Sequence, residues 1–122
     1  MGTANIRLKR AYEAAADDDG TRVLVDRIWP RGVSKDQAQL DFWLKDIAPS
    51  SELRTWWDHD PERLEAFADR YEQELSDDDH VEAVDELIRL VHDNERVTLL
   101  YAAKDERNNH AKILQDYIRR HS

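Results

Sequence analysis

Two short runs of branched apolar residues constrain the fold of this chain more than any other feature of its sequence. One run lies within Arg22–Ile28 and the other within Val97–Ala103. Each run is apolar at consecutive central positions, which is typical of a strand buried on both faces of a sheet. Such strands pair in parallel, and the segments that connect them are usually helical. The two runs therefore predict an α/β fold, with the first strand near the centre of the sheet.

The segments between and after these runs have the signals of amphipathic helices. Asp60, Pro61 and Glu62 form the strongest helix start, with a cap, a proline at the first position and an acidic first turn. Apolar residues then recur at steps of three and four, which places them on one face of each helix. The residues expected to face the core from three such helices are Leu64, Phe67, Tyr71, Leu75, Val81, Val84, Ile88, Val91, Ala111, Leu114, Tyr117 and Ile118.

Shorter signals predict the remaining elements. Residues 6–8 alternate apolar and basic as a short strand does, and Ser34 with Gln37 forms a capping box that predicts a short helix. Ser50 or Ser51 can cap another helix, whereas the apolar but aperiodic stretch 40–49 is expected to be irregular or briefly helical. Four aromatic residues in this region are expected in the core: Phe42, Trp43, Trp56 and Trp57.

The length and the apolar content set the scale of the fold. With 122 residues, 40% of them apolar, the chain has enough residues for one core and too few for a two-domain enzyme. We therefore expect a single domain over residues 1–122: a small α/β fold whose mainly parallel sheet has helices on both faces.

The chain has more acidic than basic residues, and it favours Asp over Glu and Arg over Lys. Its formal net charge is −9, with 17 Asp against 10 Glu and 13 Arg against 5 Lys. An acidic surface that is poor in lysine is typical of salt adaptation, so a halophilic source is expected. The same charge disfavours duplex nucleic acid as a partner, because duplex binding needs a basic surface. A local basic cluster can still bind one small anion.

Several classes of chemistry are excluded or disfavoured by missing residues. The chain has no cysteine, which excludes disulfides, thiolate metal sites and cysteine nucleophiles. Its three glycines form no phosphate-binding loop, and His59 between Asp58 and Asp60 lacks the spacing of a metal site. No cofactor and no metal are expected. With neither a leader peptide nor an apolar run near the roughly 18 residues that span a bilayer, a cytoplasmic protein without a membrane partner is expected. The oligomeric state stays open.

Charged and aromatic side chains follow both buried runs, at the edge of a parallel sheet where ligands usually bind. Arg27 and Arg31 follow the first run, and Lys104 follows the second; Lys45 stands out in the apolar stretch between them. If the two strands are adjacent, these cations lie together at one edge of the sheet and can hold an anion. The alternative is that Arg27 and Arg31 pair with Asp26, Asp36 or Asp105 and only fix the loop.

The same edge carries candidates for proton transfer and for shaping a site. Asp26 ends a buried strand, so it either pairs with an arginine or serves as a general acid or base. His110, near the start of the last helix, titrates near neutral pH and is the other candidate, with capping or packing as the alternative. Trp29 offers a stacking face and Tyr101 a hydroxyl, although each is also compatible with a packing role.

Three segments also support a resemblance to a known family. They are residues 22–35 (RVLVDRIWPRGVSK), residues 42–54 (FWLKDIAPSSELR) with His59-Asp60-Pro61, and residues 97–110 (VTLLYAAKDERNNH). Together they closely resemble the YeaO-like branch of the domain of unknown function 488 family. The resemblance implies a compact α/β fold with parallel strands and implies no reaction. The positions that match the family motifs are Asp26, Arg27, Trp29, Pro30, Arg31, Gly32, Trp43, Lys45, His59, Tyr101, Lys104 or Asp105, and His110.

The chain departs from relatives outside this branch at one point of the resemblance. Those relatives carry a cysteine near the position of Tyr101 and a Cys-His-Arg run where this chain has Asn109-His110-Ala111. Only His110 is retained. A thiol-dependent role of those relatives therefore cannot be transferred to this chain, whereas a pocket of Arg, Asp and His could be.

These features support two hypotheses of function. The first is an anion-binding pocket at the carboxyl ends of the strands, in an enzyme that uses acid-base chemistry on a phosphorylated or nucleotide-like small molecule. The second is a noncatalytic binding or regulatory module that recognises a protein or a nucleic-acid end through the Trp29 and Arg31 loop. Whether the chain is an enzyme stays open.

Overall fold

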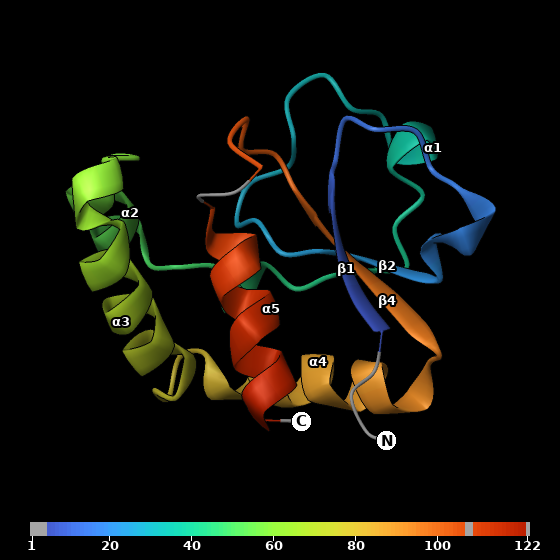
Figure 1. Cartoon of the computed structure of the whole chain (residues 1–122). Coiled ribbons are helices and arrows are strands. Elements are labelled where there is room, and N and C mark those ends of the chain that lie inside the picture. Colours follow the sequence, from blue (N-terminus) through green and yellow to red (C-terminus); the bar gives the residue numbers. More distant parts are fainter. Residues whose placement is uncertain (1–4, 107–108, 122) are drawn as a thin grey trace.

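A computed structural model describes residues 5–106 and 109–121 of the chain. Figure 1 shows a sheet with its longer helices gathered on one side. In chain order the elements are β1 (Asn5–Arg10), the 3-10 helix η1 (Asp17–Asp19), β2 (Thr21–Leu24), α1 (Lys35–Ala38), β3 (Phe42–Trp43), η2 (Lys45–Ile47), α2 (Ser51–Trp57), η3 (Pro61–Arg63), α3 (Leu64–Leu75), α4 (Val81–Asp93), β4 (Arg96–Tyr101) and α5 (His110–His121).

The sheet has four strands in the order β1-β4-β2-β3, and every pair is parallel. The two apolar runs form β2 and β4, which are the central strands and lie next to each other, with Val23 opposite Leu99. This confirms the predicted parallel α/β fold. Because the strands are parallel and adjacent, the loops that follow β2 and β4 leave the same edge of the sheet.

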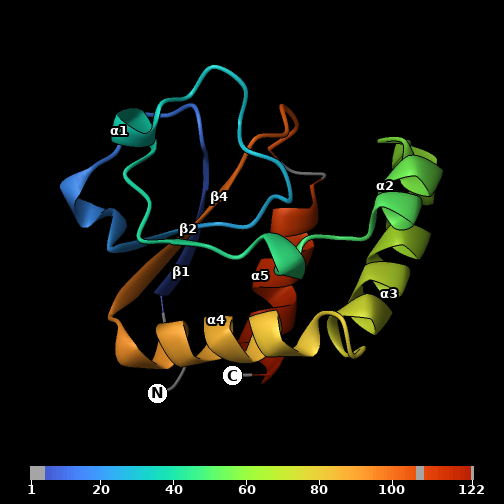
Figure 2. The ribbon, with the colours of Figure 1, turned by 180° about the vertical axis from the view of Figure 1, so that it is seen from behind.

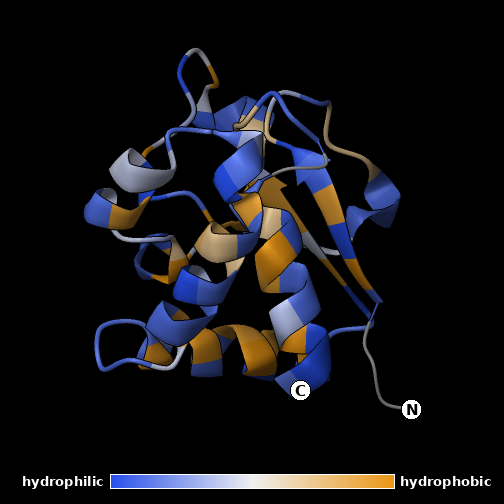
Figure 3. Cartoon of the chain, turned by 60° about the vertical axis from the view of Figure 1, so that its left-hand side comes forward, coloured by the Kyte–Doolittle hydropathy of each residue, from blue (hydrophilic) through white to orange (hydrophobic). Residues whose placement is uncertain are grey.

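The two faces of the sheet are covered differently. Val97, Leu99 and Tyr101 point to the face on which α3, α4 and α5 pack, and this face holds the larger core. Leu24 and Leu100 point to the other face, which the loops and the single-turn α1 cover. Figure 2, seen from behind, shows α1 and the three longer helices on opposite sides, and Figure 3 shows apolar positions recurring along α4 and α5.

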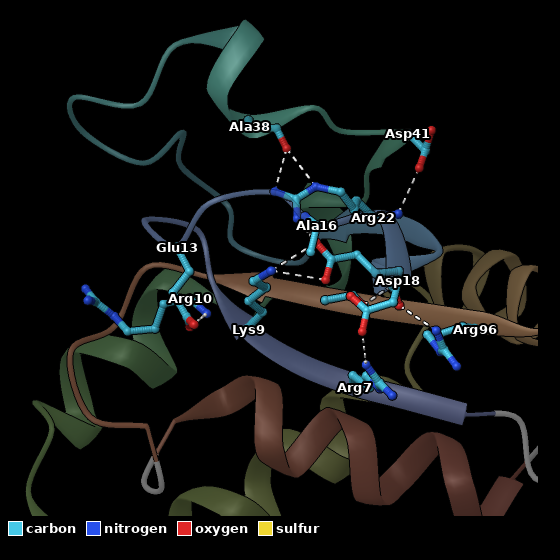
Figure 4. Close-up of polar contacts among 12 residues, drawn as sticks. Arg7, Lys9, Arg10, Glu13, Ala16, Asp18, Arg22, Ala38, Asp41 and Arg96 are labelled. Atoms are coloured by element: carbon cyan, nitrogen blue, oxygen red, sulfur yellow. Dashed lines mark hydrogen bonds and ion pairs between the residues drawn. The ribbon is translucent and has the colours of Figure 1, made fainter.

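A buried group of charged side chains lies on the face under the loops. Asp19 forms ion pairs with Arg22 and Lys9, and the side chain of Arg22 also donates to the carbonyl oxygen of Ala38 at 2.9 and 2.7 Å. Thr98 donates to the carbonyl oxygen of Asp19 at 2.6 Å. Figure 4 shows Arg22 and Lys9 converging from two strands. This group joins η1, α1 and three strands.

The predicted helix starts are confirmed. Ser34 and Gln37 form the capping box of α1, Ser50 accepts from the N–H of Leu53 at the start of α2, and Asp60 caps η3, which leads into α3. On α4, Leu87 and Leu90 are buried, whereas Val81 is 39% exposed, so the buried face is rotated from the predicted one.

The prediction that Phe42 and Trp43 lie in the core is wrong. They form β3, a strand of two residues, and are 40% and 37% exposed because an edge strand has a neighbouring strand on one side only. Trp57 is buried in the core as predicted, and Trp56 is half-buried. No helix among the described residues is long and apolar enough to span a bilayer.

Candidate functional site

The loops after β2 and β4 enclose a cavity of about 270 Å³ together with the start of α5 and the α2 region. Half of its lining residues lie in the segment 26–31 of the loop after β2. The lining residues are Asp26, Arg27, Ile28, Trp29, Pro30, Arg31, Ala48, Arg54, His59, Ala102, Ala103 and His110. The structure therefore brings together Asp26, Arg27, Trp29, Arg31 and His110, five of the residues that the sequence singled out.

Asp26 joins the two loops. The N–H of Val25 donates to the carbonyl oxygen of Leu100, which extends the pairing of β2 and β4 by one residue. Asp26 comes next, and its Oδ2 accepts from the backbone N–H of Ala102 at 2.9 Å. Trp43 holds the backbone of Asp26 from the other side, donating from Nε1 to its carbonyl oxygen at 2.7 Å. The carboxylate is consequently fixed at the base of the cavity, with a side chain that is only 16% exposed.

His110 is the first residue of α5 and lies beside Asp26. Asn109 caps this helix, since its Oδ1 accepts from the N–H of Lys112 at 2.9 Å. His110 Nε2 lies 3.0 Å from the carbonyl oxygen of Val25 and 3.2 Å from Oδ1 of Asp26. A carbonyl oxygen only accepts, so Nε2 carries a proton and donates it. The imidazole is therefore held against the end of β2.

The arginines around the cavity have few partners. Arg27 donates to the carbonyl oxygen of Ala48 over a long 3.4 Å, and Arg54 donates to the hydroxyl of Ser51 at 3.2 Å. Arg31 is exposed. None of the three takes part in an ion pair between described residues. The loop-fixing pairs with Asp26 or Asp36 that the sequence left open are therefore not formed.

Three buried polar atoms of the lining residues have no hydrogen-bond partner. They are Oδ1 of Asp26, Nε of Arg27 and Nε of Arg54. Buried polar atoms in proteins are nearly always hydrogen-bonded, so each exception needs an explanation. That three of them belong to one small cavity marks the cavity as the best candidate for a ligand site.

Aromatic rings support and border the cavity. Trp29 donates from Nε1 to the carbonyl oxygen of Val33 at 2.6 Å and meets Trp43 edge to face at 5.5 Å, which fixes its ring in the wall. His59 has a positive φ of 53° and lies 4.9 Å from the ring of Trp57. The wall near residues 29 and 59 is therefore preformed.

Tyr71 supports the floor from α3. It is completely buried, donates to the carbonyl oxygen of Ile47 at 2.7 Å, and meets the ring of His110 edge to face at 6.1 Å. Burial raises the pKa of Tyr71 well above its usual range, the charges of Glu74 and Asp26 raise it further, and Arg27 opposes them. The hydroxyl consequently stays protonated and remains a donor.

Three residues singled out from the sequence lie outside the lining. Tyr101 points into the core and is only 2% exposed, and burial raises the pKa of its hydroxyl. Lys45 lies over the ring of Trp43 at 5.2 Å, and Lys104 is exposed in the loop after β4. Two titratable residues of the lining were not selected from the sequence as ligand-binding: Arg54 and His59. Their only signal was their place in the second motif of the family resemblance.

The fold and the cavity define a class: a small α/β protein with a parallel sheet and a ligand-sized cavity at the carboxyl ends of its central strands. A family model described as "Inactive DUF488-N3 subclade" matches residues 5–122. The chain therefore belongs to the DUF488 family, and its relatives include YeaO, which confirms the resemblance found in the sequence.

Two relatives show how far the similarity extends. An uncharacterized protein of Mycobacterium tuberculosis (strain ATCC 25618 / H37Rv) is 46% identical over 113 residues, covering 93% of this chain and 92% of the relative. The uncharacterized protein YeaO of Escherichia coli (strain K12) is 40% identical over 115 residues, covering 94% and 97%. No solved structure matches the chain.

Proposed function

We propose that this protein binds a small anionic molecule in the cavity between the loops after β2 and β4. The observation that carries the proposal is the set of three arginines, Arg27, Arg31 and Arg54, that have no carboxylate partner among the described residues. Two of them have a buried Nε atom that lacks an acceptor. A guanidinium group pairs well with the oxygens of a phosphate or a carboxylate. An anionic group in the cavity supplies the missing acceptors.

The size of the cavity and the charge of the chain narrow the class of ligand. About 270 Å³ is at the low end for a ligand pocket and fits a phosphate or carboxylate group with a small substituent. The net charge of −9 opposes an extended polyanion, because repulsion grows with every additional phosphate. A single small anion is therefore favoured over a nucleic-acid strand.

Binding without turnover is favoured over catalysis. Nε2 of His110 donates its proton to a backbone carbonyl oxygen, so it is not available as a base toward a ligand. The lining residues in the described part of the chain include no Ser, Thr or Cys to act as a nucleophile. The description of the matching family model as inactive also favours binding without turnover.

An acid-base enzyme acting on a phosphorylated or nucleotide-like molecule is the second candidate. It is supported by the 3.2 Å contact between Oδ1 of Asp26 and Nε2 of His110, a pair that can hold and move one proton. The two candidates share the anion site. Product formation from a ligand that binds would favour the enzyme, and its absence would favour a binding protein.

Replacing Arg31 with alanine is expected to weaken the binding of a phosphorylated ligand by about 1.5–3 kcal/mol, the usual cost of losing a hydrogen bond to a charged group. Arg31 is exposed and has no ion pair between described residues, so the fold should keep its stability. The measurement is thermal unfolding of both proteins with a panel of phosphorylated metabolites, nucleotides and carboxylates. A ligand at 100 times its Kd stabilises the wild type by roughly 2.7 kcal/mol.

Arg89→Ala is the matched control, because Arg89 is also an exposed arginine, pairs with Glu86 on α4, and is not part of the cavity lining. The control should keep the full ligand-induced shift in Tm. An equal shift in all three proteins would show that Arg31 takes no part in binding, and no shift with any ligand in the wild type would contradict the anion site itself.

A further inference from the structure

The unpartnered atoms around the cavity are of two opposite kinds. Nε of Arg27 and Nε of Arg54 are donors that lack acceptors, whereas Oδ1 of Asp26 is an acceptor that lacks a donor. Each atom belongs to a side chain that lines the cavity. A fourth unpartnered atom, Nε of Arg96, lies at the opposite end of β4. A ligand that satisfies these atoms must therefore both accept hydrogen bonds from the arginines and donate one to Asp26.

The neighbours of Asp26 do not supply the missing donor. Its Oδ2 takes the N–H of Ala102, which leaves Oδ1. His110 Nε2 lies 3.2 Å from Oδ1 and forms its hydrogen bond with the carbonyl oxygen of Val25. One N–H cannot fully satisfy two acceptors, so Oδ1 of Asp26, a residue of the cavity lining, keeps a free lone pair.

A fully ionised anion does not suit such a site. Its oxygens would satisfy Arg27 and Arg54, but another of its oxygens would meet Oδ1 of Asp26 with lone pairs on both atoms. Such a contact is repulsive and leaves the carboxylate oxygen desolvated without a partner. An oxyanion that retains a proton turns the same contact into a short charge-assisted hydrogen bond.

We infer that the cavity selects an oxyanion that carries a proton, namely hydrogen phosphate or the singly protonated phosphate group of a small ester, and rejects a fully ionised oxyanion of the same shape such as sulfate. This inference rests on the proposed anion-binding function. Asp26 is the residue that sets the specificity, because its Oδ1 accepts a hydrogen bond from an oxyanion that carries a proton. The arginines bind the negative charge of the oxyanion.

The test compares inorganic phosphate with sulfate, two tetrahedral oxyanions of similar size, by isothermal titration calorimetry at pH 7. Wild-type protein should bind phosphate at least about tenfold more tightly than sulfate, since one hydrogen bond to a charged group is worth that factor or more. In Asp26→Asn the side-chain amide can present its N–H₂ to the ligand. The preference should fall to about twofold or less, chiefly because sulfate binds more tightly.

Asp58→Asn is the matched control. Asp58 is exposed, precedes His59 and has a positive φ of 48°, a conformation that asparagine adopts readily. The substitution removes the same charge near the cavity without changing its lining. It should raise the affinity for both anions equally and leave the phosphate preference intact.

The outcomes separate the inference from the proposed function. Equal affinity for phosphate and sulfate in the wild type would overturn the inference and leave the anion site standing. So would a preference that survives in Asp26→Asn, provided that the circular dichroism spectrum shows a folded variant. Binding of neither anion would instead contradict the proposed function.

Discussion

Replacing Asp19 with alanine is expected to lower the free energy of unfolding by about 3–5 kcal/mol, the usual cost of removing one partner of a buried ion pair. Asp19 is 5% exposed, and its carboxylate pairs with Arg22, which is 4% exposed. Without Asp19 the guanidinium group stays buried, and the carbonyl oxygen of Ala38 is its one remaining partner among the described residues. Lys9 also loses its acceptor. Urea unfolding of both proteins measures the difference.

Asp17→Ala provides the control for this substitution. Asp17 lies in the same 3-10 helix and carries the same charge, but its side chain is exposed. The free energy of unfolding should change by no more than about 0.5 kcal/mol. If Asp17→Ala and Asp19→Ala cost the same, the buried pair contributes nothing beyond net charge, and its assigned role is wrong.

The same pair should make stability depend on pH in the acidic range. Burial raises the pKa of Asp19, but hydrogen bonds from the N–H of Ala16 and from Lys9 and Arg22 outweigh it and hold the pKa below its ordinary value of 3.8. A lowered pKa in the folded state contributes stability above the unfolded pKa of about 3.9, and this contribution is lost as the pH falls through the folded value. The stability gap between wild type and Asp19→Ala should therefore narrow below about pH 4.

The sequence predicted those parts of the fold that local patterns determine. The two apolar runs were sufficient to place β2 and β4, since continuous apolar positions require burial on both faces. The helix starts followed from Ser34, Ser50 and Asp60, because caps act within one turn. The strand β3 was missed because its two residues are held by pairing with Val23 and Leu24, far away in sequence.

The candidate site was predicted where it follows directly from the strand ends. Asp26, Arg27 and Arg31 line the cavity because the end of a parallel strand fixes the edge at which the next residues emerge. Tyr101 is still within β4 and shares its alternation with Val97 and Leu99, so its side chain faces the core.

Residues from helices that pack against the loops were harder to predict. Arg54 reaches the cavity through the position of α2 relative to the loop after β2. That position depends on tertiary packing, including the contact between the hydroxyl of Ser50 and Glu74, and no local pattern encodes it.

Replacing Tyr71 with alanine is expected to cost about 3–5 kcal/mol of stability, as removal of a large buried aromatic side chain does. The ring is completely buried, lies 6.0 Å from Phe67 in a stacked arrangement, and meets His110 edge to face. Its loss leaves a cavity in the core and removes the support beneath His110. Denaturant unfolding monitored by circular dichroism measures the cost.

Tyr71→Phe separates the hydroxyl from the ring. The phenylalanine keeps the packing but leaves the carbonyl oxygen of Ile47 without its 2.7 Å donor, so a loss of about 1–3 kcal/mol is expected. Ile47 directly precedes Ala48 in the cavity lining, so this donor also fixes the wall that Arg27 contacts. A variant as stable as the wild type would show that the hydroxyl does not hold η2 in place. A variant as unstable as Tyr71→Ala would instead assign nearly all the stabilisation to that one hydrogen bond.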